Sequence, residues 1–467
     1  MFDFIKITNE ELQTIKSYIC HKETLASDIS LGFLSMWKDF IDAYYILYED
    51  TIIIRITKGE GYAFSFPIGK SIDKAFDKLR EYTKINEIPL RFYALTEENI
   101  NYLKKYKDNL VYSFDDRFSD YIYSFDDILN FAGKKYKGQR NYINKFLKLY
   151  GEPNLKPIKK EDIKDIYTML KKYELEHNIN TLMESYELKG TKMLLDSFLD
   201  LNLIGAYITI NDEIVSFTIS EVINDTLIIH VEKALKKIDG IYPLTFNYFV
   251  KMINEKYTNI KCINREDDSG DLGIRYSKMQ YNPIKKETKY QLNFDSLLYN
   301  FNSPILSNDN ICLTPINEND KEDYYKISIS EINKYYGYDY EKDLYLSNPI
   351  NSDSFYNSLI FDKQIGDSIS FGIRLNPNSN LIGECVLWHF TKTSIEIGIR
   401  LIKDYHNRGI GTKAFSILAK YAKEHFKTKI IAKCYKENKN SYKMIIASGF
   451  KETKYDNEYY YFEYIEK

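Results

Sequence analysis

Two closely spaced glycines, Gly409 and Gly411, separate segments whose apolar residues repeat with different periods. Before the glycines, apolar residues alternate along Ser394–Leu401 (SIEIGIRL), which predicts a strand with one buried face. After them the apolar residues have the spacing of a helix with one buried stripe, at Ala414, Ile417, Leu418, Tyr421 and Ala422. This strand–turn–helix unit restricts the C-terminal part of the chain to a fold that mixes helices and strands.

The glycine junction has two interpretations. The first N–H groups of a helix lack backbone partners and carry partial positive charge, and glycine lets the main chain approach a bulky anion such as a pyrophosphate. For the glycines taken alone a plain tight turn is the favoured interpretation, because glycine suits any turn with unusual backbone angles. The surrounding sequence has to decide between the two.

Composition sets the outer limits. The 467 residues are 44% hydrophobic and 28% charged, with a net charge of -3, so we expect several globular domains and no global preference for nucleic acid or anionic membranes. The N-terminus lacks the apolar core of a signal peptide, and the apolar runs are of strand length. We therefore expect a cytoplasmic protein without a transmembrane segment.

We expect no metal site. The five cysteines are scattered and never form a C-x-x-C pair, which argues against a zinc site or a disulfide framework. Glu266, Asp267 and Asp268 lack the spacing of a calcium loop, and His230 with Glu232 lacks a third ligand.

The order of elements predicts three consecutive domains. A polar stretch from 293 to 310 marks a boundary near residue 300, and helices followed by antiparallel strands occur both before and after it. In the last part we expect strands at 311–315, 368–375, 381–390, 394–401, 430–435, 450–455 and 459–465, with helices at 319–336, 411–425 and 441–448. The predicted fold class is α/β, with mixed sheets, in domains 1–135, 136–295 and 305–467.

The glycine turn resembles motif A of the GNAT acetyltransferase superfamily, written Q/R-x-x-G-x-G/A, with His406 at its first position. Downstream, ENKNSYKMIIASGF (437–450) resembles the ending common in the branch that includes the ribosomal-protein N-terminal acetyltransferases. The resemblance covers about residues 305–467. It implies a GNAT fold, acetyl coenzyme A as cofactor, and acetyl transfer to a primary amine, either a protein N-terminus or a cationic small molecule.

The resemblance also implies site residues. Glu396 would be the catalytic base, against the alternative that it is a solvated partner of Arg400. Ser441 would contact the coenzyme and donate to the leaving thiolate, against the alternative of a helix-capping serine. The implied cofactor-binding residues are Ile399, Arg400, Leu401, Ile402, Arg408, Gly409, Ile410, Gly411, Thr412, Asn438 and Ser441.

The segment between the first two strands of this region should select the acceptor. It holds nine acids against four lysines, so an acidic wall would favour a cationic amine. Its tyrosines in NKYYGYDYEKDL could contact the acceptor or simply pack. The acids are Glu318, Asp320, Glu322, Asp323, Glu331, Asp339, Glu341, Asp343 and Asp353.

Residues 1–295 resemble another family in three stretches: FSDYIYSFDDILNFAGKKYKGQRNYINKFLKLY, HVEKALKKIDGIYPLTFNYF and INREDDSGDLGIRYSKMQYNP. They resemble the phosphatidylglycerol lysyltransferase C-terminal domain family. This implies two GNAT-like folds in tandem and a relationship to transferases that use aminoacyl-tRNA. The implied function is aminoacyl transfer from tRNA, or alternatively non-catalytic recruitment of a partner.

The candidate ligand site of this module combines a basic helix with a charge cluster. Residues 134–148 carry six bases and no acid, which could hold phosphates of tRNA or of a lipid head group, or could form a solvated helix face. The charge cluster could equally be structural ion pairs. The candidates are Arg140, Asn141, Lys145, Arg265, Asp267, Asp268, Arg275 and Lys278.

Overall fold

The structure, a computed structural model, describes residues 3–19, 25–58, 61–179, 182–308, 310–330 and 351–465. Three mixed sheets with flanking helices confirm the predicted α/β class. The chain forms two compact units: unit 1 comprises residues 1–56, 65–75 and 115–289, and unit 2 comprises 57–64, 76–114 and 290–467. The division into three domains stays a prediction. Within the described residues, no helix is both long and apolar enough to cross a bilayer.

Unit 1 is built on a seven-stranded sheet with the order β14-β8-β13-β12-β11-β10-β9. All its neighbours are antiparallel except β12 and β13, which run parallel. Its strands are β8 (Asp120–Ser124), β9 (Asn154–Pro157), β10 (Ile204–Ile210), β11 (Glu213–Ile223), β12 (Thr226–Ala234), β13 (Cys262–Asn264) and β14 (Lys285–Glu287). The long strands β11 and β12 are buried on both faces because helices cover both sides of the sheet.

Two cores flank this sheet. One contains Tyr121, Phe246 and Phe249, and is covered by α5 (Phe125–Asn130), α6 (Lys137–Tyr150) and α9 (Ile241–Lys256). The other contains Leu34 and Phe217, and includes α1 (Glu11–Ile19), α2 (Leu31–Trp37), α7 (Ile163–His177) and α8 (Leu182–Asp196). The short helix α10 (Leu272–Met279) has no buried residue. Unit 1 also includes β1 (Ile5–Lys6), β2 (Tyr44–Tyr48), most of β3 (Thr51–Lys58) and β5 (Ile68–Gly69).

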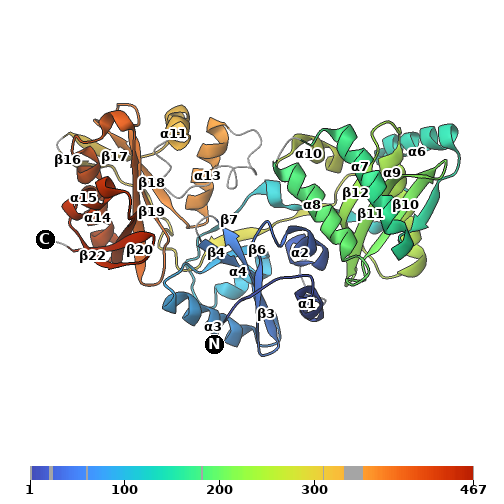
Figure 1. Cartoon of the computed structure of the whole chain (residues 1–467), viewed down its shortest axis with the longest axis horizontal. Coiled ribbons are helices and arrows are strands. Elements are labelled where there is room, and N and C mark those ends of the chain that lie inside the picture. Colours follow the sequence, from blue (N-terminus) through green and yellow to red (C-terminus); the bar gives the residue numbers. More distant parts are fainter. Residues whose placement is uncertain are drawn as a thin grey trace. The chain divides into compact units, whose positions relative to one another are not determined.

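The C-terminal sheet of unit 2 has the strand order β16-β17-β18-β19-β20-β21-β23-β22. Its strands are β16 (Leu306–Asn308), β17 (Ile311–Pro315), β18 (Ile369–Arg374), β19 (Gly383–Trp388), β20 (Ser394–Leu401), β21 (Lys429–Tyr435), β22 (Phe450–Tyr455) and β23 (Tyr459–Tyr464). Helices α14 (Ile410–Phe426) and α15 (Lys439–Ala447) lie on one side of the sheet, and α11 (Lys321–Ser328) and α13 (Ser352–Gln364) on the other (Figure 1).

These elements confirm the expected ones to within a few residues. Helix α14 buries Ala414, Phe415, Leu418, Ala419 and Ala422, which is the stripe that the sequence spacing predicts, with small residues where the helix meets the sheet. The helix expected at 319–336 is described as α11, and its last part lies outside the described residues.

A second group of strands belongs to unit 2. It contains β4 (Gly61–Phe64), β6 (Arg91–Leu95), β7 (Tyr112–Phe114) and β15 (Tyr290–Asn293), with most of α3 (Ile72–Ile85) and with α4 (Glu97–Leu103). Nε of Arg91 lies 2.7 Å from Oδ1 of Asp367, and Nδ2 of Asn293 donates to the carbonyl oxygen of Phe390 at 3.0 Å. Buried polar contacts therefore join these strands to the C-terminal sheet.

Candidate active site

Strands β20 and β21 are hydrogen-bonded at one end and separate at the other. Their parallel pairing runs only from Ser394–Lys429 to Glu396–Ile431, although both strands continue for several residues. A cavity of about 560 Å³, counting solvent at its mouth, opens along the separated part. It is lined by Trp388, Glu396, Ile397, Gly398, Ile399, Phe415, Lys433, Cys434, Tyr435, Asn438, Ser441, Met444, Ile445 and Tyr459.

The two glycines of the turn have different structural roles. Gly409 caps α14 in the left-handed region, with φ of 73°, and a Cβ atom there would meet nothing within 4 Å among the described atoms. A Cβ on Gly411 would lie 3.3 Å from the sulfur of Met444 and 3.9 Å from Cδ1 of Ile399, both of which line the cavity. Gly409 therefore permits the turn, and Gly411 keeps the start of α14 close to the cavity wall.

No side chain caps the N-terminus of α14 within the described structure. His406 instead donates from Nε2 to the carbonyl oxygen of Leu401 at 2.8 Å, which ties the turn to the end of β20. Arg408 is exposed, and its guanidinium lies 5.6 Å from the centre of the Tyr405 ring. The N–H groups at the start of α14, including Ile410 and Thr412, thus face a turn that could hold an anion.

Glu396 lies at the point where the strands begin to separate. Its Oε2 accepts from Nδ1 of His389 at 2.9 Å, and its Oε1 lies 4.0 Å from Nζ of Lys433. Burial raises the pKa of Glu396, but the charge and hydrogen bond of His389, the charge of Lys433 and a hydrogen bond from Trp388 outweigh it, and the pKa is lowered. Glu396 is therefore a carboxylate at neutral pH.

Arg400 is not the partner of Glu396. Its Nε lies 2.6 Å from Oε2 of Glu384, and its Nη2 donates to Oγ of Ser328 at 3.0 Å. Arg400 and Glu384 are both buried on the α11 side, and Arg400 is not among the residues that line the cavity. Ile402 donates its N–H to the carbonyl oxygen of Ile382, so that group is also engaged.

Helix α15 begins beside the same cavity. Oδ1 of Asn438 accepts from the N–H of Ser441 at 3.1 Å, so Asn438 is the capping residue. Ser441 is not the capping residue, and it lines the cavity together with Asn438. The capping alternative for Ser441 is thereby removed, whereas its contact with a coenzyme stays a prediction.

The acids of the acceptor segment are engaged where they are described. Lys321 lies 3.0 Å from Glu318 and 2.6 Å from Asp353, and Arg374 lies 2.6 Å from Asp320. Asp323 pairs with Lys326 at 3.6 Å, and Glu322 accepts from Ser352 at 2.6 Å. The other four acids, Glu331, Asp339, Glu341 and Asp343, and the tyrosine-rich stretch lie outside the described residues.

The charge cluster expected in the first half lies together in unit 1, and its members pair with one another or with nearby groups. Arg265 is buried and pairs with Glu232 at 2.6 Å, while Arg275 pairs with Asp268 at 2.8 Å. Asp267 lies 3.1 Å from Lys289, and Lys278 donates to the main-chain carbonyls of residues 265 and 267. These contacts favour the alternative of structural ion pairs.

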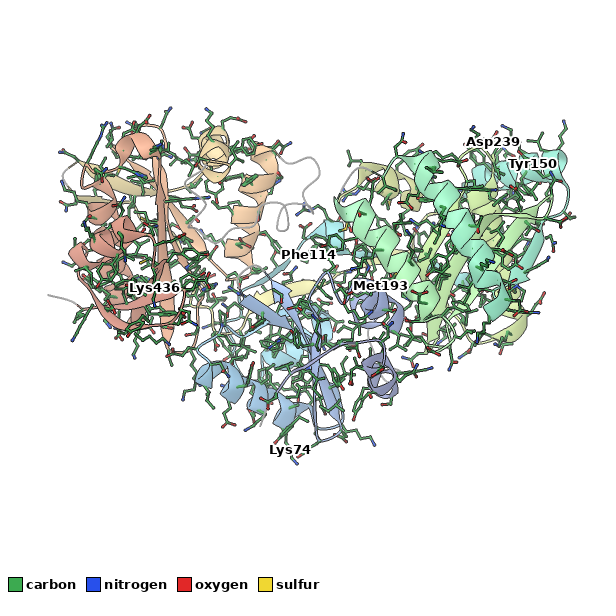
Figure 2. The ribbon with its side chains drawn as sticks, in the orientation of Figure 1. Lys74, Phe114, Tyr150, Met193, Asp239 and Lys436 are labelled. Atoms are coloured by element: carbon green, nitrogen blue, oxygen red, sulfur yellow. The ribbon has the colours of Figure 1, made fainter. Side chains whose placement is uncertain are left out.

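The three candidates on α6 are separate from one another. Arg140 donates to the carbonyl oxygens of Phe131 and Gly133, and Lys145 pairs at 2.5 Å with Asp239, which is exposed and labelled in Figure 2. Asn141 is exposed on the helix surface. Their role in ligand binding stays a prediction.

Two family models match the chain. Residues 22–293, more than half of the 467, match the model described as phosphatidylglycerol lysyltransferase, C-terminal. The chain belongs to this family. Residues 310–451 match the acetyltransferase (GNAT) domain, so this lysyltransferase family member carries a GNAT domain at its C-terminal end and is an acyltransferase. No curated protein matches the sequence.

Solved structures resemble both halves. A conserved protein of unknown function from Bacteroides thetaiotaomicron is 26% identical over 62% of this chain and 99% of its own, with a TM-score of 0.58. L-PGS from Bacillus licheniformis is 15% identical over 62% of this chain and 92% of its own, with a TM-score of 0.44. Mycobacterium smegmatis RimJ, in complex with CoA-disulfide, is 18% identical over 33% of this chain and 80% of its own, with a TM-score of 0.28.

Sequence reasoning missed several residues of this family member's C-terminal site. His389, Trp388 and Lys433 interact with Glu396, and Tyr459 lines the same cavity; none of the four was among the expected site residues. Alternation along β21 could have placed Lys433 on the face away from the buried Ile430 and Ala432. His389 has no such signal, because it follows β19 with φ of 47°, where no periodicity applies.

Proposed function

We propose that residues 305–467 transfer an acetyl group from acetyl coenzyme A to a primary amine. The observation that carries this is the uncapped N-terminus of α14, opened by Gly409 beside a cleft between separated strands. The match of residues 310–451 to the GNAT acetyltransferase domain supports the same assignment.

The residues present fit a coenzyme A molecule. The N–H groups from Arg408 to Thr412 would hold the pyrophosphate, because they lie at the positive end of a helix of 17 residues. The separated edge of β20 from Ile399 to Leu401 would run alongside the pantetheine arm, in the cavity that Ile399, Asn438 and Ser441 line. When bound, acetyl coenzyme A would supply the acetyl group as an activated thioester.

The chain's own groups would hold the acceptor and move its proton. Glu396, kept ionised by His389 and Lys433, would accept the proton of the acceptor ammonium directly or through water. The hydroxyl of Ser441 would donate a hydrogen bond to the departing sulfur. The half-buried Trp388 at the edge of the cavity would limit the access of bulk water to these groups.

Binding of acetyl coenzyme A by the full chain tests the proposal. Gly409→Asp would place a carboxylate where the pyrophosphate is expected, and we expect no binding measurable by isothermal titration calorimetry. The matched control is Gly409→Asn, which has the same shape, tolerates the left-handed region and carries no charge. Equal affinity of the Asp and Asn variants, or no binding by the native chain, would reject the proposed site.

Unit 1 offers a second function, aminoacyl transfer from tRNA, because residues 22–293 match a lysyltransferase family model. A non-catalytic recruitment role is the alternative, and the pairing of Arg265, Asp268 and Lys278 within the protein is compatible with it. Exposed bases of α6 such as Lys137 and Lys148 provide the surface on which a polyanion could bind.

A further inference from the structure

The end of α15 packs against the beginning of α14. Oγ of Ser448, the residue that follows α15, donates to the carbonyl oxygen of Thr412 at 3.2 Å, and it lies 2.8 Å from the carbonyl oxygen of Met444. The hydroxyl has a single hydrogen, so the two carbonyls share it. Because Ser448 is only 3% exposed, water has little access to this contact. A buried hydroxyl therefore joins two helices that lie on the same side of the sheet (Figure 1).

A second contact between the two helices lies next to the first. Met444 is four residues before Ser448, so both side chains project from the same face of α15. The sulfur of Met444 lies 3.3 Å from the position that a Cβ of Gly411 would take, so this side chain packs directly on the glycine. Helix α15 thereby contacts two consecutive residues in the first turn of α14, Gly411 and Thr412.

The same first turn supplies N–H groups that are proposed to hold the diphosphate. In a helix the N–H groups point toward the N-terminus and the carbonyl groups point toward the C-terminus. Ser448 binds the carbonyl of Thr412, so this contact positions the turn without using its N–H groups. No side chain caps the turn within the described part of the chain. The direction of its N–H groups therefore depends on how neighbouring elements hold the turn.

We propose that Ser448 is a positioning residue for the diphosphate of the acyl donor. Its hydroxyl holds the first turn of α14 where the N–H groups from Arg408 to Thr412 converge on one anion. Ser448 is not among the residues that line the cavity, so it acts through Thr412 and does not touch the donor. This role rests on the proposed use of acetyl coenzyme A, and it adds a contribution of α15 to that of Asn438 and Ser441.

A role limited to stability is the alternative. The contact of the hydroxyl with the carbonyl of Met444 lies within the last turn of α15, and its loss would lower the free energy of unfolding whether or not a donor binds. The positioning role predicts, in addition, a weaker affinity for the diphosphate. The affinity of the folded protein for the donor separates the two roles, since a purely structural contact leaves this affinity unchanged.

Two ligands that share the diphosphate test the proposal on the full chain. Isothermal titration calorimetry measures Kd for acetyl coenzyme A and for the nucleotide half of coenzyme A, which carries the diphosphate without the pantetheine arm. Ser448→Ala removes the shared hydrogen bond, and we expect Kd to rise about threefold for both ligands. Ser448→Thr keeps the hydroxyl and should bind both ligands within about 1.5-fold of the native chain.

Thr428→Val is the matched control, because Oγ1 of Thr428 donates to the carbonyl oxygen of Thr393 at 2.9 Å, at the end where β20 and β21 stay paired. It should lose stability in urea denaturation as Ser448→Ala does, with Kd unchanged. An unchanged Kd in Ser448→Ala, an equal increase in Thr428→Val, or weakening for acetyl coenzyme A alone would overturn the positioning role. If threonine does not fit the buried site, the comparison of Ser448→Ala with Thr428→Val decides. Absence of acetyl coenzyme A binding by the native chain would instead reject the proposed function, and the positioning role with it.

Discussion

Nε2 of His406 lies 2.8 Å from the carbonyl oxygen of Leu401, so a side chain at the first position of the glycine turn holds the end of β20. At this position the GNAT motif has glutamine or arginine, which are also hydrogen-bond donors. The contact fixes the turn relative to the strand that borders the cavity, and it explains how histidine can take this position.

His406→Ala should weaken acetyl coenzyme A binding. A lost neutral hydrogen bond is worth about 1 kcal/mol, which corresponds to about a fivefold increase in Kd. His406→Gln retains a donor and should bind within about twofold of the native chain. Calorimetric titration measures both variants, and equal weakening by Ala and Gln would show that the hydrogen bond is not what matters.

His389→Gln should shift the pH dependence of acetyl transfer. Burial raises the pKa of Glu396, but His389 and Lys433 outweigh burial, and the pKa is lowered. Glu396 therefore becomes protonated, and can no longer act as a base, only when the pH falls below this lowered pKa. Removing the histidine removes a cause of the lowering, and the acidic limb of kcat/KM against pH should move to higher pH. A limb that stays in place would show that Glu396 does not control it.

The stability of unit 1 should decrease at alkaline pH. His230 is buried and donates to both Glu221 and Glu266, at 2.9 and 2.7 Å; burial lowers its pKa, but the two carboxylates outweigh burial and raise it to about 9. A group whose pKa is raised on folding stabilises fully below its ordinary value of 6.5 and loses this contribution as the pH rises through 9.

Calorimetric unfolding scans between pH 6 and pH 10 measure this loss, which should reach at most about 3 kcal/mol from this group. His230→Gln should be less stable at pH 6 and should show a flatter pH dependence. An equally steep dependence in the variant would assign the effect to other groups.

Glu384→Gln should destabilise unit 2 strongly. Its partner Arg400 is 7% exposed, and removal of one member of a buried ion pair leaves an unpaired charge, which costs about 3 kcal/mol or more. Asp353→Asn is the control, because its pair with Lys321 is solvent-screened and should contribute little to stability. Urea denaturation compares them, and similar losses would contradict the distinction.

If unit 1 binds tRNA, exposed lysines of α6 should contribute rather than Arg140, whose guanidinium is engaged with main-chain carbonyls. Lys137→Glu with Lys148→Glu should weaken binding and reduce the salt dependence of log Kd, by about one unit of slope for each phosphate that is no longer neutralised. Lys171→Glu on α7 is the matched exposed control. Fluorescence anisotropy at several salt concentrations measures the effect, and salt-insensitive binding would exclude a tRNA site.

Local patterns predicted the elements around the site well. The helix expected at 411–425 is Ile410–Phe426, and the strand expected at 394–401 is Ser394–Leu401, because alternation and helical spacing are properties of short segments. The meeting of Glu396 with His389 and Lys433 depends on strand register and on where two strands separate, which no local pattern encodes. The same applies to β15, which precedes the expected boundary near 300 but lies in unit 2.

The buried pair of Arg91 and Asp367 determines where this chain can be cut into fragments. Arg91 comes before the lysyltransferase-like sheet in sequence and Asp367 comes after it, yet their side chains are only 8% and 10% exposed. A residue upstream of the GNAT match thus supplies the buried counter-charge of an aspartate within it. A fragment excised at residue 300 would leave Asp367 without its guanidinium, and it should express poorly unless that aspartate is replaced by a neutral residue.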